Sequence, residues 1–146
     1  MAAKRNTPGG TGNEGRQAGS TDRRQAVGRR GEDIAAAYLE ARGYRVIGRN
    51  IRCELGELDL VAMQDEYLVF VEVKTRARMT AYHPTLAITA AKKQKLRELG
   101  AWFLAHHPTE RPMQPRFDVV TVVLAPGRKA DGKPDEAQVE HYPNAL

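Results

Sequence analysis

A single cysteine, Cys53, stands among the 146 residues of this chain. An intrachain disulfide is therefore excluded, and so is a structural zinc site that needs several thiolates. No activating base is evident near Cys53, so we interpret this thiol as chemically inert. No apolar run approaches the ~20 residues that span a bilayer, and the N-terminus lacks the apolar segment of a signal peptide. We therefore expect a cytoplasmic protein without a membrane partner.

Motifs for nucleotide chemistry and for serine hydrolysis are absent as well. The sequence contains no Walker loop and no GxGxxG segment, the glycine-rich loops that hold nucleotide phosphates. It also lacks the Gly-x-Ser-x-Gly elbow that carries the nucleophile of α/β hydrolases. Neither a nucleotide-binding fold nor a serine hydrolase has support in this sequence.

Positive charge is what the chain does have. It carries 23 Lys and Arg against 18 Asp and Glu, a formal net charge of +5, which favours a polyanionic partner such as DNA. Residues 1–24 are rich in Gly, Thr, Asn and charge, without apolar periodicity, which is typical of a disordered tail. Residues 25–146 suffice for one domain with a modest core.

The segment Gly56–Arg76 (GELDLVAMQDEYLVFVEVKTR) contains two β-type runs separated by a short polar break. Residues two apart in a strand share a face. Glu57 and Asp59 should therefore share one face of the first strand, and Glu72 and Lys74 one face of the second. The apolar residues just before Glu72 indicate that the second strand is buried on both sides.

The length of the break decides whether these faces meet. If Asp65 and Glu66 form a two-residue hairpin loop, Asp59 lies opposite Glu72, and Glu57 lies opposite Lys74. Cβ atoms of opposed residues are roughly 4.5–5.5 Å apart. A four-residue loop keeps this register, but a slip of one residue sends Asp59 to the other face. Asp-Glu is not a favoured two-residue turn, so a longer loop or a bulge stays an alternative.

Two carboxylates at such a distance repel each other unless a cation lies between them. Mg²⁺ is commonly held by one or two carboxylates, water and substrate phosphate oxygens. With Lys74 beside Asp59 and Glu72 to orient water or stabilise charge, the set predicts hydrolysis of a phosphodiester. The alternative interpretation is a solvated strand face with a plain Glu–Lys ion pair.

Asp59 followed by Glu72-Val73-Lys74 resembles the signature of the PD-(D/E)XK nuclease superfamily. The flanking sequences, GELDLVA and LVFVEVKTR, resemble those of its YraN-like family. The resemblance covers residues 27–146; Leu58 stands where the superfamily name has Pro. It implies a restriction-endonuclease-like α/β fold, with a mixed central sheet flanked by helices. It also implies an Mg²⁺- or Mn²⁺-dependent endonuclease similar to Holliday-junction resolvases, with Asp59, Glu72 and Lys74 as catalytic residues.

Further site residues follow from the same resemblance and from helix periodicity. The related resolvases carry a first-helix Glu that joins the metal site, which makes Glu32 a catalytic and metal-ligand candidate; helix-dipole stabilisation is its alternative. The carbonyl of Val73 is a candidate ligand beside Asp59 and Glu72. Candidate phosphate contacts are Arg76, Lys92, Lys93 and Arg97, and Lys92 lies on the core side of its helix.

The order of periodic segments predicts the remaining elements. We expect helices over residues 28–42 and 89–106 and strands over 44–50, 68–74, 116–124 and 137–142, besides the strand that carries Glu57 and Asp59. A polar loop, 77–84, would contact substrate. Asp118 should pair with Arg116, His106 and His107 should cap the second helix, and His141 should be structural.

Two other functions stay open beside the nuclease. One is a nucleic-acid-binding protein without catalysis, in which the acidic cluster is a relic or an ion pair. The other is a scaffold for a protein partner. Resolvase-like nucleases often act as dimers on symmetric substrates, so the resemblance also raises a homodimer.

Overall fold

The structure is a computed structural model that describes residues 15–76, 88–124, 130–132 and 136–146. Along the chain its elements are α1 (Gly15–Glu40), β1 (Arg45–Cys53), β2 (Gly56–Gln64), β3 (Tyr67–Arg76), α2 (Ala90–His106), β4 (Gln114–Val123) and β5 (Gln138–Tyr142). Among these described elements, no helix is long and apolar enough to cross a membrane.

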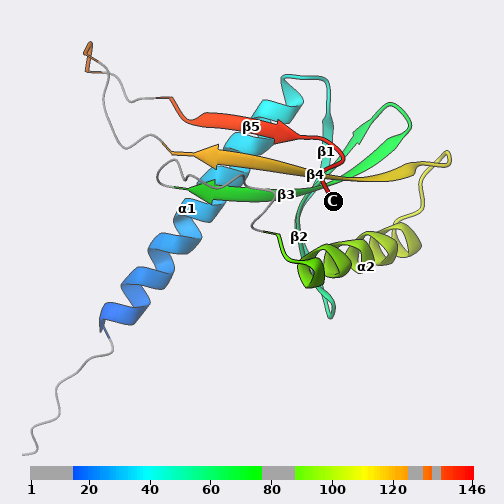
Figure 1. Cartoon of the computed structure of the whole chain (residues 1–146), viewed down its shortest axis with the longest axis horizontal. Coiled ribbons are helices and arrows are strands. Elements are labelled where there is room, and N and C mark those ends of the chain that lie inside the picture. The colour runs from blue at the N-terminus through cyan, green and yellow to red at the C-terminus, as the bar shows by residue number, and fades with distance from the viewer. Residues whose placement is uncertain (1–14, 77–87, 125–129, 133–135) are drawn as a thin grey trace, which may run out of the picture.

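The five strands form one mixed sheet in the order β1-β2-β3-β4-β5 (Figure 1). Neighbouring strands are antiparallel except for β3 and β4, which run parallel. A parallel pair needs a crossover, and the connection between these two strands includes α2. This mixed α/β arrangement, a sheet flanked by two helices, confirms the predicted fold class and is consistent with a restriction-endonuclease-like fold.

The two helices cover opposite faces of the sheet because β3 is apolar on both sides. Val69 and Val71 belong to the core cluster that contains α1 residues, whereas Leu68 and Phe70 belong to the cluster that contains α2 residues. All four side chains are almost completely buried. Strand β3 is therefore the centre of the domain, and the acidic segment at its end is held by packing on both faces.

Helix α1 begins earlier than predicted. The expected start was Gly28, but the helix begins at Gly15 and so includes part of the predicted tail; residues 1–14 lie outside the described part of the chain. Its first half has no apolar stripe, which is the signal that sequence reading relies on. The helix continues there because a packed C-terminal half removes the cost of nucleation, and proline is absent from Gly15 onward within it.

The other element boundaries follow the predictions closely. Gly43 ends the first helical segment with a φ of +87°, a conformation that favours glycine. The Thr89 side chain caps α2 by accepting a hydrogen bond from the Lys92 N–H at 3.1 Å. At the other end, the ring nitrogens of His106 and His107 lie 2.8 and 3.2 Å from carbonyl oxygens of the last turn, which confirms their capping role.

Asp118 is fully buried at the centre of a polar network between β4 and β5. Arg116 donates two hydrogen bonds to its carboxylate at 2.8 and 2.9 Å, which confirms the predicted pair. His141 lies 2.7 Å from one oxygen, and the Asn144 N–H donates to the other at 2.9 Å. Burial raises the pKa of Asp118, but the bonds from His141, Arg116 and Asn144 outweigh it, so its pKa lies below the ordinary value.

We predict that Asp118→Ala lowers the free energy of unfolding by roughly 3–5 kcal/mol, because it leaves Arg116 and His141 without their shared anion. The measurement is urea denaturation at neutral pH. Because the folded pKa of Asp118 is lowered, its contribution is present above the unfolded pKa and is lost as the pH falls through the folded value.

Arg52→Ala is the control for this prediction. It removes an exposed ion pair with Glu57 and should change the unfolding free energy by less than about 1 kcal/mol. Equal effects of the two substitutions would contradict a special role for the buried network.

Candidate active site

The hairpin between β2 and β3 has the predicted register over its first five pairs. Gln64 pairs with Tyr67, and the ladder continues to Leu60 opposite Val71. The loop has two residues, and Asp65 adopts a φ of +51°, a left-handed conformation that Asp tolerates. The longer-loop alternative is therefore wrong.

Beyond Leu60 the prediction fails, because the two strands separate. The expected pairs of Asp59 with Glu72 and of Glu57 with Lys74 are not part of the ladder. Glu57 instead forms an ion pair with Arg52 of β1 at 3.1 Å. Glu57 is therefore not a member of the acidic site.

A lost alternation in β2 explains this separation. Leu58 and Val61 both belong to the cluster beneath α2, whereas Leu60 and Ala62 belong to the cluster beneath α1. Strict alternation would have placed Leu58 on the side of Leu60. The change of face occurs at Asp59, whose carboxylate accepts a hydrogen bond from the Val73 N–H at 2.9 Å. The side chain thereby satisfies a backbone group of β3 at the point where ladder pairing stops.

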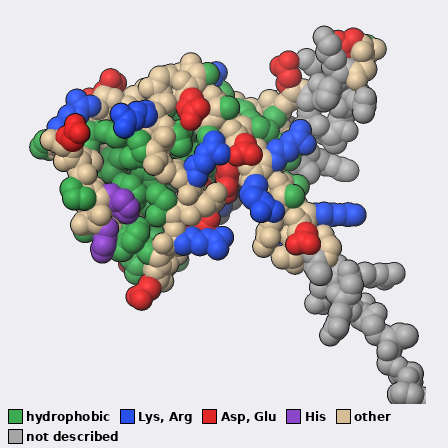
Figure 2. All heavy atoms as spheres, turned by 180° about the vertical axis from the view of Figure 1, so that it is seen from behind, with side chains coloured by type: hydrophobic (Ala, Val, Ile, Leu, Met, Phe, Trp, Pro, Cys, Tyr) green, Lys and Arg blue, Asp and Glu red, His purple; other side chains and the backbone are tan. Residues whose placement is uncertain are grey.

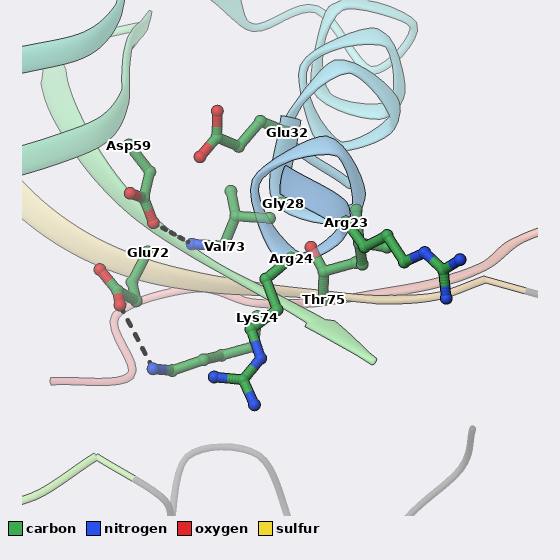
Figure 3. Close-up of a pocket in the computed structure, with 10 residues that line it drawn as sticks. Arg23, Arg24, Gly28, Glu32, Asp59, Glu72, Val73, Lys74 and Thr75 are labelled. Carbon is green, nitrogen blue, oxygen red and sulfur yellow. Dashed lines mark hydrogen bonds and ion pairs between the residues drawn. The ribbon is translucent and has the colours of Figure 1, made fainter. Parts of the chain in front are cut away.

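A pocket of about 520 Å³ opens at this point, between the ends of β2 and β3 and helix α1 (Figure 3). Strand residues supply one side of it, and α1 supplies the other. Its lining is Arg23, Arg24, Val27, Gly28, Glu32, Asp59, Glu72, Val73, Lys74 and Thr75. The structure thus brings together five of the predicted site residues, Glu32, Asp59, Glu72, Val73 and Lys74.

Glu72 is the most buried acid of the pocket, with 6% of its surface exposed. Lys74 lies 3.3 Å from its carboxylate, and Lys92 of α2 reaches the same oxygen at 3.6 Å. The predicted approach of Lys92 toward the acidic cluster is therefore observed. This arrangement also contains the Glu–Lys ion pair of the alternative interpretation, which accounts for Glu72 but not for its acidic neighbour.

Asp59 is that neighbour, and its environment disfavours a negative charge. Burial raises the pKa of Asp59 to about 7, and repulsion from Glu72 adds to the effect, with a smaller contribution from Glu32. The hydrogen bond from the Val73 N–H and the positive charge of Lys92 lower the pKa of Asp59, but they offset these effects only in part. Among the described residues, no Lys or Arg forms an ion pair with Asp59. The site therefore contains one carboxylate neutralised by lysines and another that is not.

Glu32 reaches the pocket because α1 lies unusually close to β3. Its neighbour Gly31 is buried, and a Cβ atom at Gly31 would collide with the Thr75 side chain. Glycine is required here for the close approach of helix and strand. Figure 3 shows the Glu32 side chain directed from α1 into the space beside Asp59.

The predicted phosphate contacts lie outside this pocket. Arg76 is exposed at the end of β3, and Lys93 and Arg97 lie along α2, away from the lining. Their role stays a prediction. The predicted substrate loop, residues 77–84, falls outside the described residues.

Sequence reading missed Arg23 and Arg24. Both lie in the segment predicted as a disordered tail, yet they line the pocket from α1. A signal was present: Arg24, Gly28 and Glu32 are four residues apart, so they share one face once the helix extends that far. That extension carries no apolar periodicity, so the spacing alone does not predict a helix there.

The anionic side chains of this pocket that could ligate a metal are all carboxylates, and it contains no His or Cys. Carboxylate ligands suit hard cations such as Mg²⁺ better than zinc. Within the described residues, however, no group of three His, Cys, Asp or Glu side chains is already gathered in a metal-binding arrangement. Asp59 and Glu72 are the pair on which any ion would depend.

Comparison with known proteins identifies the family. The model of the "Uncharacterised protein family UPF0102" matches residues 31–122. A UPF0102 protein of Syntrophotalea carbinolica is 45% identical over 126 residues, which cover 86% of this chain and 95% of the relative. One from Beutenbergia cavernae is 44% identical over 118 residues, 81% of this chain and 93% of the relative. The chain therefore belongs to the UPF0102 family, the YraN-like family that its sequence resembles.

Proposed function

We propose that this protein is a metal-dependent endonuclease that hydrolyses phosphodiester bonds in DNA or structured nucleic acid. The observation that carries the proposal is Asp59, a partly buried carboxylate beside Glu72 without an ion-pair partner among the described residues. A protein gains nothing in stability from such a group. A divalent cation would turn the repulsion between the two carboxylates into attraction.

The residues present fit Mg²⁺ or Mn²⁺. Asp59 and Glu72 would hold the ion, with the Val73 carbonyl and Glu32 as further ligands, directly or through water. Two carboxylates plus water and phosphate oxygens form a typical magnesium site. When bound, the ion supplies a lowered pKa for a water molecule and neutralises charge on the phosphate.

The side chains of the protein supply positioning and charge. Lys74, 3.3 Å from Glu72, is placed to orient the attacking water and to stabilise negative charge on the phosphate. In the reaction, the water oxygen bonds to phosphorus and loses a proton. The bond from phosphorus to the leaving sugar oxygen breaks, and that oxygen takes up a proton. Lys92 also reaches Glu72 and would turn to the phosphate once the ion neutralises that carboxylate.

A nucleic-acid-binding protein without catalysis is the second candidate. It is favoured by the two lysines that already neutralise Glu72, because a relic site can persist as an ion-paired core. The two candidates differ in what removal of Asp59 does. Without Asp59 a relic keeps its nucleic-acid binding, whereas an enzyme loses its activity.

For the nuclease, we predict that Asp59→Asn and Lys74→Ala each lower the metal-dependent cleavage rate by about 10²-fold or more. The assay uses branched and linear DNA with Mg²⁺ or Mn²⁺. Asparagine keeps the acceptor for the Val73 N–H but removes the charge that binds the ion.

Glu57→Gln is the matched control for this assay. It neutralises an acid of the same strand that pairs with Arg52 outside the pocket, and cleavage should continue at close to the wild-type rate. Absence of metal-dependent cleavage by the wild-type protein on all substrates would favour the binding candidate.

We also predict a dependence of stability on pH in metal-free protein. Because the pKa of Asp59 is raised from 3.8 to about 7, ionisation destabilises the fold progressively as the pH rises through this interval. Asp59→Asn should therefore stabilise the protein by on the order of 2 kcal/mol at pH 8, and by much less near pH 4. Urea denaturation of both proteins at the two pH values, in the presence of a chelator, measures the difference.

Mn²⁺ should make the wild type more stable than Asp59→Asn, the opposite of the order in metal-free protein. Added at pH 8, it should raise the melting temperature of the wild type but not that of Asp59→Asn, because the ion binds the folded state through the ionised carboxylate. A shift of equal size in both proteins would place the ion elsewhere.

A further inference from the structure

The first half of α1 projects from the body of the domain, and its base borders the pocket (Figure 1). Arg23 and Arg24 lie on this projecting part. Both side chains are exposed, and neither forms an ion pair with another described residue. Figure 2 shows Lys and Arg side chains gathered around acidic ones on the face where the helix meets the domain.

The charge balance of the pocket explains why these arginines matter. Its lining contains three carboxylates, Glu32, Asp59 and Glu72, and three cationic side chains, Arg23, Arg24 and Lys74. Without a cation the charges are equal in number. A bound divalent ion leaves the lining with two excess positive charges, so the occupied pocket attracts a polyanion.

The spacing along α1 gives the distance between the arginines and Glu32 along the helix axis. Arg24 precedes Glu32 by eight residues, which corresponds to about 12 Å along a helix. One strand of a B-form duplex carries one phosphate per ~3.4 Å of its axis. Arg24 is thus displaced from Glu32 along the helix by a distance comparable to about three phosphates, which suits contact with phosphates next to the one that the ion would hold.

We propose that Arg23 and Arg24, the arginine pair, bind phosphates of the strand that flanks the cleaved bond and so make the site selective for polynucleotides over small phosphodiesters. This inference rests on the proposed function for the position of the cleaved bond, but the binding itself does not require catalysis. Arg23 and Arg24 are positioning residues and not catalytic ones, because they would bind the substrate away from the reacting atoms. Guanidinium groups suit this role, since they donate in a fork that matches phosphate oxygens.

The test compares Arg23→Ala combined with Arg24→Ala against a control of equal charge change. Arg29→Ala combined with Arg45→Ala is that control. Both residues are exposed and outside the pocket lining, and Arg29 lies about 140° around α1 from Arg24. Melting curves of the two variants check that each is folded.

Binding is measured first, by fluorescence anisotropy of a labelled DNA duplex at several salt concentrations with Ca²⁺ as the cation. Each lost phosphate contact lowers the slope of log affinity against log salt by roughly 0.9. We expect the variant without the arginine pair to bind more than about tenfold more weakly and with a shallower slope, by nearly two, than the wild type. The control should keep the wild-type slope. Equal slopes in the two variants, or no binding by the wild type, would overturn the inference.

Kinetics then separate positioning from damage to the site. With Mn²⁺, loss of the arginine pair should raise KM for duplex DNA by about tenfold or more, with much less change in kcat or in hydrolysis of bis(para-nitrophenyl) phosphate. An equal loss on both substrates would assign the arginines to the integrity of the pocket and contradict the proposal. If the wild type cleaves neither substrate, the proposed nuclease fails, and the salt slopes still decide whether the arginine pair binds phosphates.

Discussion

The hydrogen bond from the Val73 N–H to the Asp59 carboxylate is the contact on which the pocket depends. It forms where β2 leaves the ladder with β3 and exchanges one face of the sheet for the other. A backbone donor that would otherwise lose its partner is satisfied by a side chain, and this holds the carboxylate beside Glu72. The strands can separate there without leaving a buried polar group unpaired, and among the described residues no buried side-chain polar atom lacks a partner.

Packing on both sides of β3 stabilises this geometry. The strand lies at the centre of the sheet, with apolar side chains beneath both helices, so the charged residues at its end cannot shift independently. Helix α1 packs closely against β3 at Gly31, and this packing places Glu32 and the arginine pair in the lining of the same pocket. Helix α2 contributes Lys92 from the other side. The pocket lining thus comes from three elements, α1, β2 and β3, and Lys92 of α2 reaches Glu72 from outside that lining.

The two neighbouring acids of the pocket, Glu72 and Asp59, lie in different electrostatic environments. Glu72 is buried with two lysines near its carboxylate, whereas Asp59 accepts one backbone hydrogen bond and is repelled by Glu72 and Glu32 more strongly than Lys92 attracts it. Buried groups with unfavourable charge commonly mark functional sites, because stability alone would remove them. The Asp118 network shows the contrast: every oxygen of that carboxylate has partners, its pKa is lowered, and its role is structural.

The sequence by itself determined the element order and the capping residues of α2, because these follow from local periodicity and from the chemistry of helix ends. The mixed sheet was implied by the family resemblance, and the length of the hairpin loop stayed open until the structure showed two residues. The sequence also singled out Asp59, Glu72 and Lys74 by their spacing. Only the tertiary structure decided that Glu57 leaves the cluster, that Asp59 turns toward Val73, and that Arg23 and Arg24 reach the pocket. The reason is physical: the lost alternation in β2 and the extension of α1 depend on contacts between elements. The four-residue spacing of Arg24, Gly28 and Glu32 places them on one face only once the helix is known to extend that far.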